Sequence, residues 1–558
     1  MAGTRGTLRL GALSTALGLL LCNCDSNPAA PEAWVLLPIA GDDQTAVVGE
    51  ALPTLLEVEV RDGRSQPVVG ADVSWSVTAG IARLENTATF TDVSGRSGNR
   101  AILGSTPGLL QISAALSNGS RVAFTAEALP SPYPSVIIID RPPAPLRRGD
   151  VFTFRAVAKD SAGEVLDPSL ISWHVAPDSG GFVDSGGRFV GYEIGAVQVV
   201  AAAIGAADTI EVEIVARRVN GQYEVVGASS IADRRTTDLW VQGVHAYTGS
   251  TGCQQALCGN LLYVWEIAGQ PSPRLVDSVL VDATQVNDVM VTSDGKVAAL
   301  THEGSDDGLN GVTLLDLSDP GHPQRITRFT EELEGGVHNL WIDGDYLYAA
   351  ASGLKIIDIS TPGSPRLVGS FHAGFSTVHD VYVRDGLAFV SHWNAGLIIL
   401  DVGAGIAGGS AANPVEISRI DPDGQTHNAW HWQERGYVFV TEEDFGTPGV
   451  VHVVDARDLG NLRRVATYRA GSASPPHFFW LDEANEVLHI AYYSEGVRAV
   501  DVSGELLGRL DSGGRELASL RYAGDETNSF GIQVHDDLIY VSDRRNGLWV
   551  LRFKTASP

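Results

Sequence analysis

The chain has 558 residues, enough for about three or four domains of ordinary size with cores of their own. Its 39 basic residues are outnumbered by 67 acidic ones, and the net charge of −28 repels phosphate backbones, which excludes nucleic acid as an expected partner. Beyond the N-terminal segment no run of about eighteen apolar residues occurs, so no internal membrane span is expected.

The N-terminal segment has the order of an export signal. Two arginines precede an apolar stretch over residues 10–21, and Cys22 and Cys24 follow at once. An apolar run that ends in cysteine resembles a bacterial lipoprotein signal, in which the cysteine thiol is lipidated. We predict a signal peptide over residues 1–24 with lipidation of Cys24, Cys22 being the alternative because a bulky leucine precedes it, and a tether over residues 25–33. A cleaved secretory signal with coincidental cysteines is the other interpretation.

This N-terminal signal predicts an exported protein in the envelope or on the outer surface of a bacterium, held to a membrane by its lipid. Exported chains meet an oxidising compartment, so Cys253 and Cys258 are predicted to form a local disulfide. A metal site at these cysteines would need two further ligands, and none lies close in the sequence.

Two segments before residue 219 repeat one strand pattern. They read "LEVEVRDGRSQPVVGADVSWSV" and "FRAVAKDSAGEVLDPSLISWHV", and each ends in a strand that carries a tryptophan, Trp75 or Trp173, between alternating apolar residues. A tryptophan on an inner strand is the usual core anchor of a two-sheet sandwich. The pattern resembles the bacterial immunoglobulin-like domains of invasin and intimin type, over residues 34–129 and 134–218. Such domains are mostly stalks of surface proteins.

Repeats of 41 to 53 residues fill the rest of the chain. Each has a first strand that opens on polar residues, a second strand such as "YLYAAA", a glycine-led third strand such as "GLKIIDIS", and a fourth strand often introduced by proline. The first strands start at Thr237, Asn287, His338, His379, His427, His477 and Phe530. Seven units of this length are typical of four-stranded propeller blades. We therefore predict an all-β protein, with two immunoglobulin-like β-sandwiches followed by a seven-bladed β-propeller over residues 222–555.

The last repeat ends after its third strand. The segment "YEVVGAS" (residues 223–229), just before the first repeat, matches the fourth-strand pattern "PRLVGSF". We predict that it pairs into the last blade and closes the ring, because an open ring would leave unpaired edge groups.

The third-strand pattern, seen in "LKIIDIS", "VTLLDLS" and "VRAVDVS", resembles the LVIVD-repeat family. The resemblance implies an exported propeller at the cell surface with a binding or adhesive role and no defined reaction. The aspartate of the pattern recurs in five blades, and we expect it to bond backbone amides between strands as a structural residue. These aspartates are Asp316, Asp358, Asp401, Asp455 and Asp501.

Four consecutive blades begin with a histidine: His338, His379, His427 and His477. Because first strands line the channel of a propeller, these side chains are expected at one mouth. Neutral imidazole is a common metal ligand, so two or more of them could hold a divalent metal. The simpler interpretation, which we favour, is that each hydrogen-bonds a neighbouring blade. The nearby acidic loop "TEEDFG" is interpreted as a solvated turn, because it lacks the ligand spacing of calcium loops.

The best overall interpretation is a lipid-anchored surface protein for binding or adhesion, whose stalk presents a propeller head to a protein or glycan. Trp393, Phe445, Tyr492 and Tyr493 are the expected contacts, because aromatic side chains give large contact area at low entropic cost. No nucleophile elbow, zinc-protease helix or phosphate loop is present, so an enzyme is the less favoured class. The alternatives are a lactonase-like, metal-dependent hydrolase that uses the histidines, and a purely structural envelope protein.

Overall fold

The computed structural model describes residues 34–129, 135–160, 163–253, 259–269, 271–374, 377–446, 449–471 and 474–556. Within these ranges the regular structure consists of strands and three short 3₁₀ helices, so the predicted all-β class is confirmed. None of these helices has the length and apolar character to cross a membrane. The signal segment with Cys22 and Cys24, the tether and Cys258 lie outside the described residues, as does the side chain of Cys253. Lipidation and the disulfide therefore stay predictions.

Contacts divide the described chain into two compact units. The first comprises residues 34–129 and 135 with the segments 159–160, 163–166 and 203–206, and the second comprises the other described residues.

The first unit contains a three-stranded sheet in the order β1-β3-β7, a five-stranded sheet in the order β2-β10-β9-β4-β6, and the pair β5-β8. Its strands are β1 (Val35–Ala40), β2 (Gln44–Val47), β3 (Leu56–Arg61), β4 (Asp72–Ala79), β5 (Ala82–Leu84), β6 (Ala88–Phe90), β7 (Arg96–Asn99), β8 (Ala101–Leu103), β9 (Gly108–Ala115) and β10 (Arg121–Leu129). Strand β10 alternates buried and exposed residues throughout, as a strand with one face on a core must. Trp75 of β4 is 4% exposed and its ring stacks on Phe124 at 6.0 Å, so it anchors this core as predicted.

The second unit begins with three small sheets, in the orders β11-β14, β12-β19-β18-β15 and β13-β17-β16. Their elements are β11 (Ser135–Ile138), β12 (Leu146–Arg147), β13 (Val151–Thr153), β14 (Ala156–Lys159), η1 (Pro168–Leu170), β15 (Ser172–Ala176), η2 (Asp178–Gly180), β16 (Gly181–Val183), β17 (Arg188–Gly191), β18 (Gly195–Ala203) and β19 (Ala206–Val215). Trp173 of β15 is only half-buried, and its ring centroid lies 6.3 Å from that of Phe154. The second tryptophan is therefore a weaker core anchor than Trp75.

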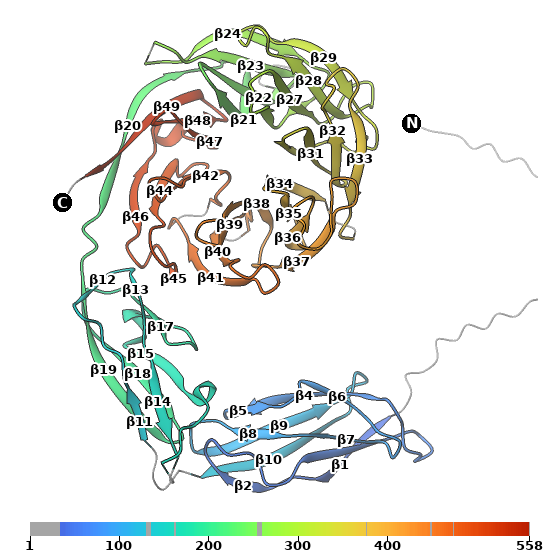
Figure 1. Cartoon of the computed structure of the whole chain (residues 1–558), viewed down its shortest axis with the longest axis vertical. Coiled ribbons are helices and arrows are strands. Elements are labelled where there is room, and N and C mark those ends of the chain that lie inside the picture. Colours follow the sequence, from blue (N-terminus) through green and yellow to red (C-terminus); the bar gives the residue numbers. More distant parts are fainter. Residues whose placement is uncertain are drawn as a thin grey trace, which may run out of the picture. The chain divides into compact units, whose positions relative to one another are not determined.

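Seven sheets follow among the described residues from 220 to 556, antiparallel except for the short parallel pair β41–β45, and Figure 1 shows them around a common centre. Their elements are β20 (Asn220–Ser229), β21 (Arg234–Gln242), β22 (His245–Cys253), β23 (Leu261–Glu266), β24 (Arg274–Leu280), β25 (Gln285–Val286), β26 (Val289–Val291), β27 (Val297–His302), β28 (Gly311–Asp316), β29 (Gln324–Phe329), β30 (Asn339–Asp343), β31 (Tyr346–Ala351), β32 (Gly353–Asp358), β33 (Arg366–Phe371), β34 (Val378–Arg384), β35 (Leu387–His392), β36 (Gly396–Asp401), β37 (Val415–Ile420), β38 (Thr426–Trp432), β39 (Tyr437–Glu442), β40 (Val451–Asp455), β41 (Arg463–Tyr468), β42 (Phe479–Asp482), β43 (Val487–Ala491), β44 (Val497–Asp501), β45 (Gly508–Arg509), β46 (Glu516–Leu520), η3 (Gly524–Glu526), β47 (Ser529–His535), β48 (Leu538–Asp543) and β49 (Gly547–Ala556).

The last of these sheets has the order β20-β49-β48-β47, so it combines the earliest strand with the three latest. Strands β20 and β49 are antiparallel, with Tyr223 opposite Phe553. Strand β21 of the next sheet lies against β47. The predicted closure by residues 223–229 is thus confirmed.

The inner strands of the sheets are almost continuously buried, and β35 and β36 are buried at every position. Their apolar side chains pack against the neighbouring sheet as well as within their own. One such cluster joins Tyr348 and Ile356 of one sheet to Val390 and Leu400 of the next. Burial between successive sheets, which is the main favourable term in folding, therefore holds the ring together and fixes the direction of the inner strands.

The recurring aspartates at the ends of the third strands are structural, as expected, but their partners differ from the prediction. They bond amides of the turn that directly follows the same strand rather than amides of another strand, because the chain reverses there. Asp316, Asp358 and Asp501 each accept from the N–H two residues later, at 2.8, 2.9 and 2.9 Å. Asp401 accepts from five backbone N–H groups, those of Gly403, Ala404, Gly405, Ala407 and Gly409.

Candidate functional site at the channel mouth

The four predicted histidines come together at the start of four consecutive first strands. Successive ring centroids lie 4.2 Å apart for His338 and His379, 4.3 Å for His379 and His427, and 4.3 Å for His427 and His477. The equal spacing reflects the equal position of each residue in its repeat, just before or within β30, β34, β38 and β42. The sequence therefore located this cluster correctly.

The two outer histidines are held by hydrogen bonds. The Nδ1 atom of His338 lies 2.5 Å from an oxygen of Glu303, and its Nε2 atom lies 3.3 Å from the amide nitrogen of Asn287. The Nδ1 atom of His477 lies 3.0 Å from the carbonyl oxygen of Phe530. These partners belong to neighbouring blades, so the favoured interpretation of hydrogen bonding across blades describes His338 and His477.

The two inner histidines differ from the outer pair. The Nδ1 atom of His379 and both ring nitrogens of His427 are buried and have no hydrogen-bond partner among the described residues. Buried polar atoms without a partner are uncommon, because each costs about 1–3 kcal/mol in lost solvation. These three nitrogens are therefore available to a ligand.

Glu443 lies beside the two inner histidines, His379 and His427, and adds a carboxylate to them. Its carboxylate and the ring nitrogens of His379 and His427 offer three ligand atoms that all lie within 4.8 Å of one another. The Nε2 atom of His427 and the Oε2 atom of Glu443 are 3.6 Å apart. Interpreting the loop "TEEDFG" as a solvated turn was wrong for Glu443, which is 7% exposed because the loop after β39 folds back over the mouth.

Hydrogen bonds to the carboxylate and to the backbone N–H of Glu443 fix its orientation. Its Oε1 atom accepts a hydrogen bond from the hydroxyl of Tyr493, and its backbone N–H donates to the carbonyl of Gln425 at 2.9 Å. The Oε2 atom is left to face His427. The sequence placed this acidic loop near the histidines but did not select Glu443, because nothing in its local pattern marks burial.

Burial sets the ionisation of the whole cluster. It holds the pKa of His379, of His427 and of His477 well below its usual range, and their mutual proximity acts in the same direction. Burial also raises the pKa of Glu443, while the bond from Tyr493 opposes that shift. The imidazoles of His379, His427 and His477 are consequently neutral near pH 7, which is the form that binds metal ions.

The four aromatic residues predicted as contacts fall into two groups. Trp393 is half-buried and stacks on His379 with centroids 4.4 Å apart, and Phe445 is 67% exposed, so both border the mouth. Tyr492 and Tyr493 are buried, so their assignment as surface contacts was wrong. The hydroxyl of Tyr492 donates to the carbonyl of Gly449 at 2.8 Å, and the hydroxyl of Tyr493 donates to the carboxylate of Glu443.

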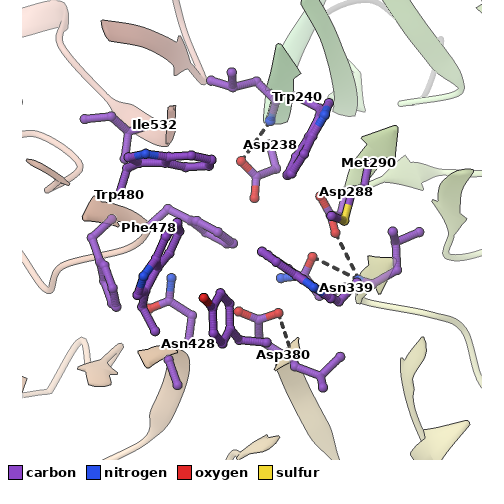
Figure 2. A pocket seen from close by; sticks show the side chains of 18 residues that line it. Asp238, Trp240, Asp288, Met290, Asn339, Asp380, Asn428, Phe478, Trp480 and Ile532 are labelled. Carbon is purple, nitrogen blue, oxygen red and sulfur yellow. Dashed lines mark hydrogen bonds between the residues drawn. The ribbon is translucent and has the colours of Figure 1, made fainter. Parts of the chain in front are cut away.

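Beneath the histidines, the next position of six of the seven first strands lines a small cavity of about 40 Å³ (Figure 2). Its polar lining comprises Asp238, Asp288, Asn339, Asp380 and Asn428. Burial raises the pKa of Asp288 to about 7 and lifts that of Asp238 and Asp380 well above the usual value. The cavity has room for one or two water molecules and no more.

Five aromatic rings encircle the channel and belong to the lining of the same cavity. They are contributed by Trp240, Trp341, Tyr382, Trp430 and Trp480, whose successive centroid separations are 6.2, 4.7, 5.1, 4.9 and 6.3 Å around a complete circuit. Sequence reasoning missed this ring, although a signal was present: an aromatic residue stands three positions after the repeat start in "TDLW", "HNLW", "HDVY", "HNAW" and "HFFW".

The family model described as LVIVD repeat matches residues 334–373 and 377–421, the two repeats that contain His338 and His379. No curated protein matches the chain. Similar solved structures include the computationally designed Ika8 protein, with 12% identity over 59% of this chain and 99% of that chain and a TM-score of 0.42. The WD40 β-propeller domain of Doa1 has 13% identity over 59% and 96% with a TM-score of 0.43, and Sqt1 of Saccharomyces cerevisiae has 11% identity over 58% and 82% with a TM-score of 0.41.

The matched repeats and the ring of sheets make the C-terminal part of this chain a β-propeller repeat protein. The resemblance to LVIVD repeats noted in the sequence is supported over these two repeats. Similarity of the solved structures at this level assigns no activity to the chain.

Proposed function

We propose that this chain is an exported, lipid-anchored binding protein of a bacterial surface. Two immunoglobulin-like domains act as its stalk, and a seven-bladed propeller is its head. The binding element of the head is a divalent metal centre at the channel mouth, with His379, His427 and Glu443 as ligands. The anchor, the stalk role and the surface location rest on the sequence patterns described above.

One observation supports the proposed metal centre most directly. Three potential ligand atoms from His379, His427 and Glu443 converge within 4.8 Å, and Nδ1 of His379 and both ring nitrogens of His427 have no hydrogen-bond partner in the described part of the chain. Ligands bound about 2.0–2.1 Å from one tetrahedral ion are about 3.3 Å apart, which is near the 3.6 Å between His427 and Glu443. A bound ion would also remove the cost of the unpartnered nitrogens.

The donor set indicates the class of metal. Two imidazoles and one carboxylate suit zinc and its first-row neighbours, whereas calcium and magnesium prefer oxygen ligands alone. Three protein ligands leave a fourth tetrahedral position open toward the mouth. A carboxylate or hydroxyl of a protein or glycan partner can occupy that position, and Trp393 and Phe445 border it as apolar contacts.

Zinc titration of the chelator-treated protein tests the proposal. We expect one equivalent of Zn²⁺ per chain by calorimetry and by metal analysis after dialysis. The His379→Ala/His427→Ala double variant should lose zinc binding, and Glu443→Gln should weaken the zinc affinity about tenfold or more. His322→Ala is the control, because His322 is exposed and outside the mouth. Unchanged zinc binding in a double variant that melts like the parent protein would overturn the metal centre.

A metal-dependent hydrolase is the second candidate, and one observation favours it. Glu303 and His338 form a carboxylate–imidazole pair at 2.5 Å, and the His338 ring lies 4.2 Å from His379. Such a pair can serve as a general base beside an open metal position. Hydrolysis of simple lactones or esters by the zinc-loaded protein, lost in His338→Ala, would move the assignment from binding to catalysis.

A further inference from the structure

Arg544 lies on the same arc of the mouth as the histidines. It follows β48 directly, and its backbone N–H donates to the carbonyl of Asn528 at 2.9 Å. Its guanidinium carbon lies 5.0 Å from the centre of the Phe530 ring, and that ring lies 3.7 Å from His477. A continuous set of ring contacts therefore leads from Arg544 through Phe530 and His477 to His427.

The charge of Arg544 has no carboxylate partner within ion-pair distance among the described residues, and its Nε atom is buried without a hydrogen bond. Two other arginines with such an Nε atom, Arg328 and Arg498, are held by ion pairs to acidic side chains. The next residue, Arg545, is exposed and lies 3.6 Å from Glu526. In a chain with a net charge of −28, an arginine at the rim of a pocket that has no carboxylate partner among the described residues needs an explanation.

Arg544 also lies close to the residues that surround the proposed metal. The Phe530 ring against its guanidinium lies 6.0 Å from the ring of Tyr493, and the hydroxyl of Tyr493 donates to Glu443. The charge of Arg544 is thus one ring contact away from the residue that orients a metal ligand.

The charges of a loaded mouth sum to a positive value. A divalent ion and Arg544 together contribute three positive charges, whereas Glu443 and Glu303 contribute two negative charges and the imidazoles of His379, His427 and His477 are neutral. Guanidinium is the side chain that pairs best with planar or tetrahedral oxyanions, because its N–H groups form a fixed fork. A half-buried site binds such an ion more strongly than an exposed one, since screening by water and salt is weaker.

We propose that the mouth binds a small oxyanion, a carboxylate or phosphate group, with one oxygen at the open metal position and another on the guanidinium of Arg544. This inference rests on the proposed metal centre and names the class of ligand that it takes. Ligand binding would then require both the ion and Arg544.

The test uses the full chain loaded with Co²⁺, whose visible spectrum reports its ligands. Inorganic phosphate and, separately, acetate are titrated into the parent protein and into Arg544→Ala, Arg544→Lys and Arg545→Ala. We expect a saturable spectral change whose midpoint rises about tenfold or more in Arg544→Ala. Arg544→Lys should be intermediate, because lysine keeps the charge but not the fork. Arg545→Ala is the matched control and should titrate like the parent protein.

The outcomes separate the two proposals. Co²⁺ binding with no difference between Arg544→Ala and the parent protein would overturn the oxyanion site and leave the metal centre standing. Failure of the parent protein to bind Co²⁺ would overturn the metal centre, and the oxyanion site with it. A response to only one of the two anions would support the site and identify its class, a phosphate or a carboxylate.

Discussion

Tyr493 donates its hydroxyl hydrogen bond to one oxygen of Glu443, and this contact leaves the other oxygen facing His427. The tyrosine belongs to one blade and the glutamate to the preceding one, so the geometry of the mouth depends on the packing of neighbouring sheets. Groups that orient a metal ligand in this way commonly matter about as much as the ligand itself.

Replacement of Tyr493 by Phe should therefore weaken zinc binding about tenfold while leaving the fold intact. The adjacent Tyr492→Phe is the control, because that hydroxyl bonds the carbonyl of Gly449 and the N–H of Ala470, away from the metal ligands. Calorimetric titration of both variants measures the difference. Equal zinc affinity in the two variants would show that Glu443 needs no such orientation.

The buried carboxyl of Asp238 should make stability depend on pH. Burial lifts its pKa well above the usual value, and nearby Asp288 adds to the shift. Below about pH 4 the group is protonated in both the folded and the unfolded chain. As the pH rises above about 4, the unfolded chain releases this proton before the folded chain does. The free energy of unfolding therefore falls until the pH has passed the folded-state pKa.

Asp238→Asn removes this titration and copies Asn339 and Asn428, which occupy the same position in other blades. We expect the variant to gain about 2 kcal/mol over the parent protein at pH 8 and far less at pH 4. The mirror variant Asn339→Asp should lose stability in the same pH range. Urea unfolding at the two pH values measures both, and a gain for Asp238→Asn that does not vary with pH would contradict the argument.

Much of the propeller could be predicted because the same strand pattern recurs in seven repeats, and aligning the repeats strengthens a pattern that is weak in any one of them. The strand order, the closure by residues 223–229 and the common position of four histidines follow from aligned repeats alone. The fine structure of the mouth could not be predicted, because the repeats differ where it matters: His338 has Glu303 as a partner, whereas His427 has a free imidazole. Burial of Glu443 and Tyr493 depends on how single loops fold back, and periodicity carries no information about that.

Closure of the ring by Tyr223 gives a direct stability test. Its side chain is buried, its hydroxyl lies 2.8 Å from Nδ1 of His489, and its ring centroid lies 5.3 Å from that of Phe553. Tyr223→Ala should cost about 3–5 kcal/mol in free energy of unfolding, because it opens a cavity at the seam. Glu224→Ala changes an exposed residue of the same strand and should cost about 0.5 kcal/mol or less. Equal costs for the two changes, measured in urea, would mean that β20 does not hold the ring.

Two aspartates with the same place in the repeat should respond differently to the same substitution. Oδ1 of Asp401 accepts from three backbone N–H groups and its Oδ2 accepts from two more, whereas Oδ1 of Asp316 accepts only from Ser318. In Asp401→Asn one oxygen becomes an NH₂ group that faces the N–H donors of the loop, so at least two of these donors lose their acceptor. We expect a loss of about 3 kcal/mol there and about 1 kcal/mol or less for Asp316→Asn, where the remaining oxygen still accepts.

The difference between these two variants should also depend on pH. Burial would raise the pKa of Asp401, but its backbone hydrogen bonds outweigh this and hold the pKa below the usual range. The stability that the carboxylate contributes is therefore present above about pH 4 and is lost as the pH falls through the folded-state pKa. Thermal melts between pH 3 and pH 7 should show the cost of Asp401→Asn shrinking with acid. A cost that stays constant over this range would show that the asparagine disrupts the loop for reasons other than the lost charge.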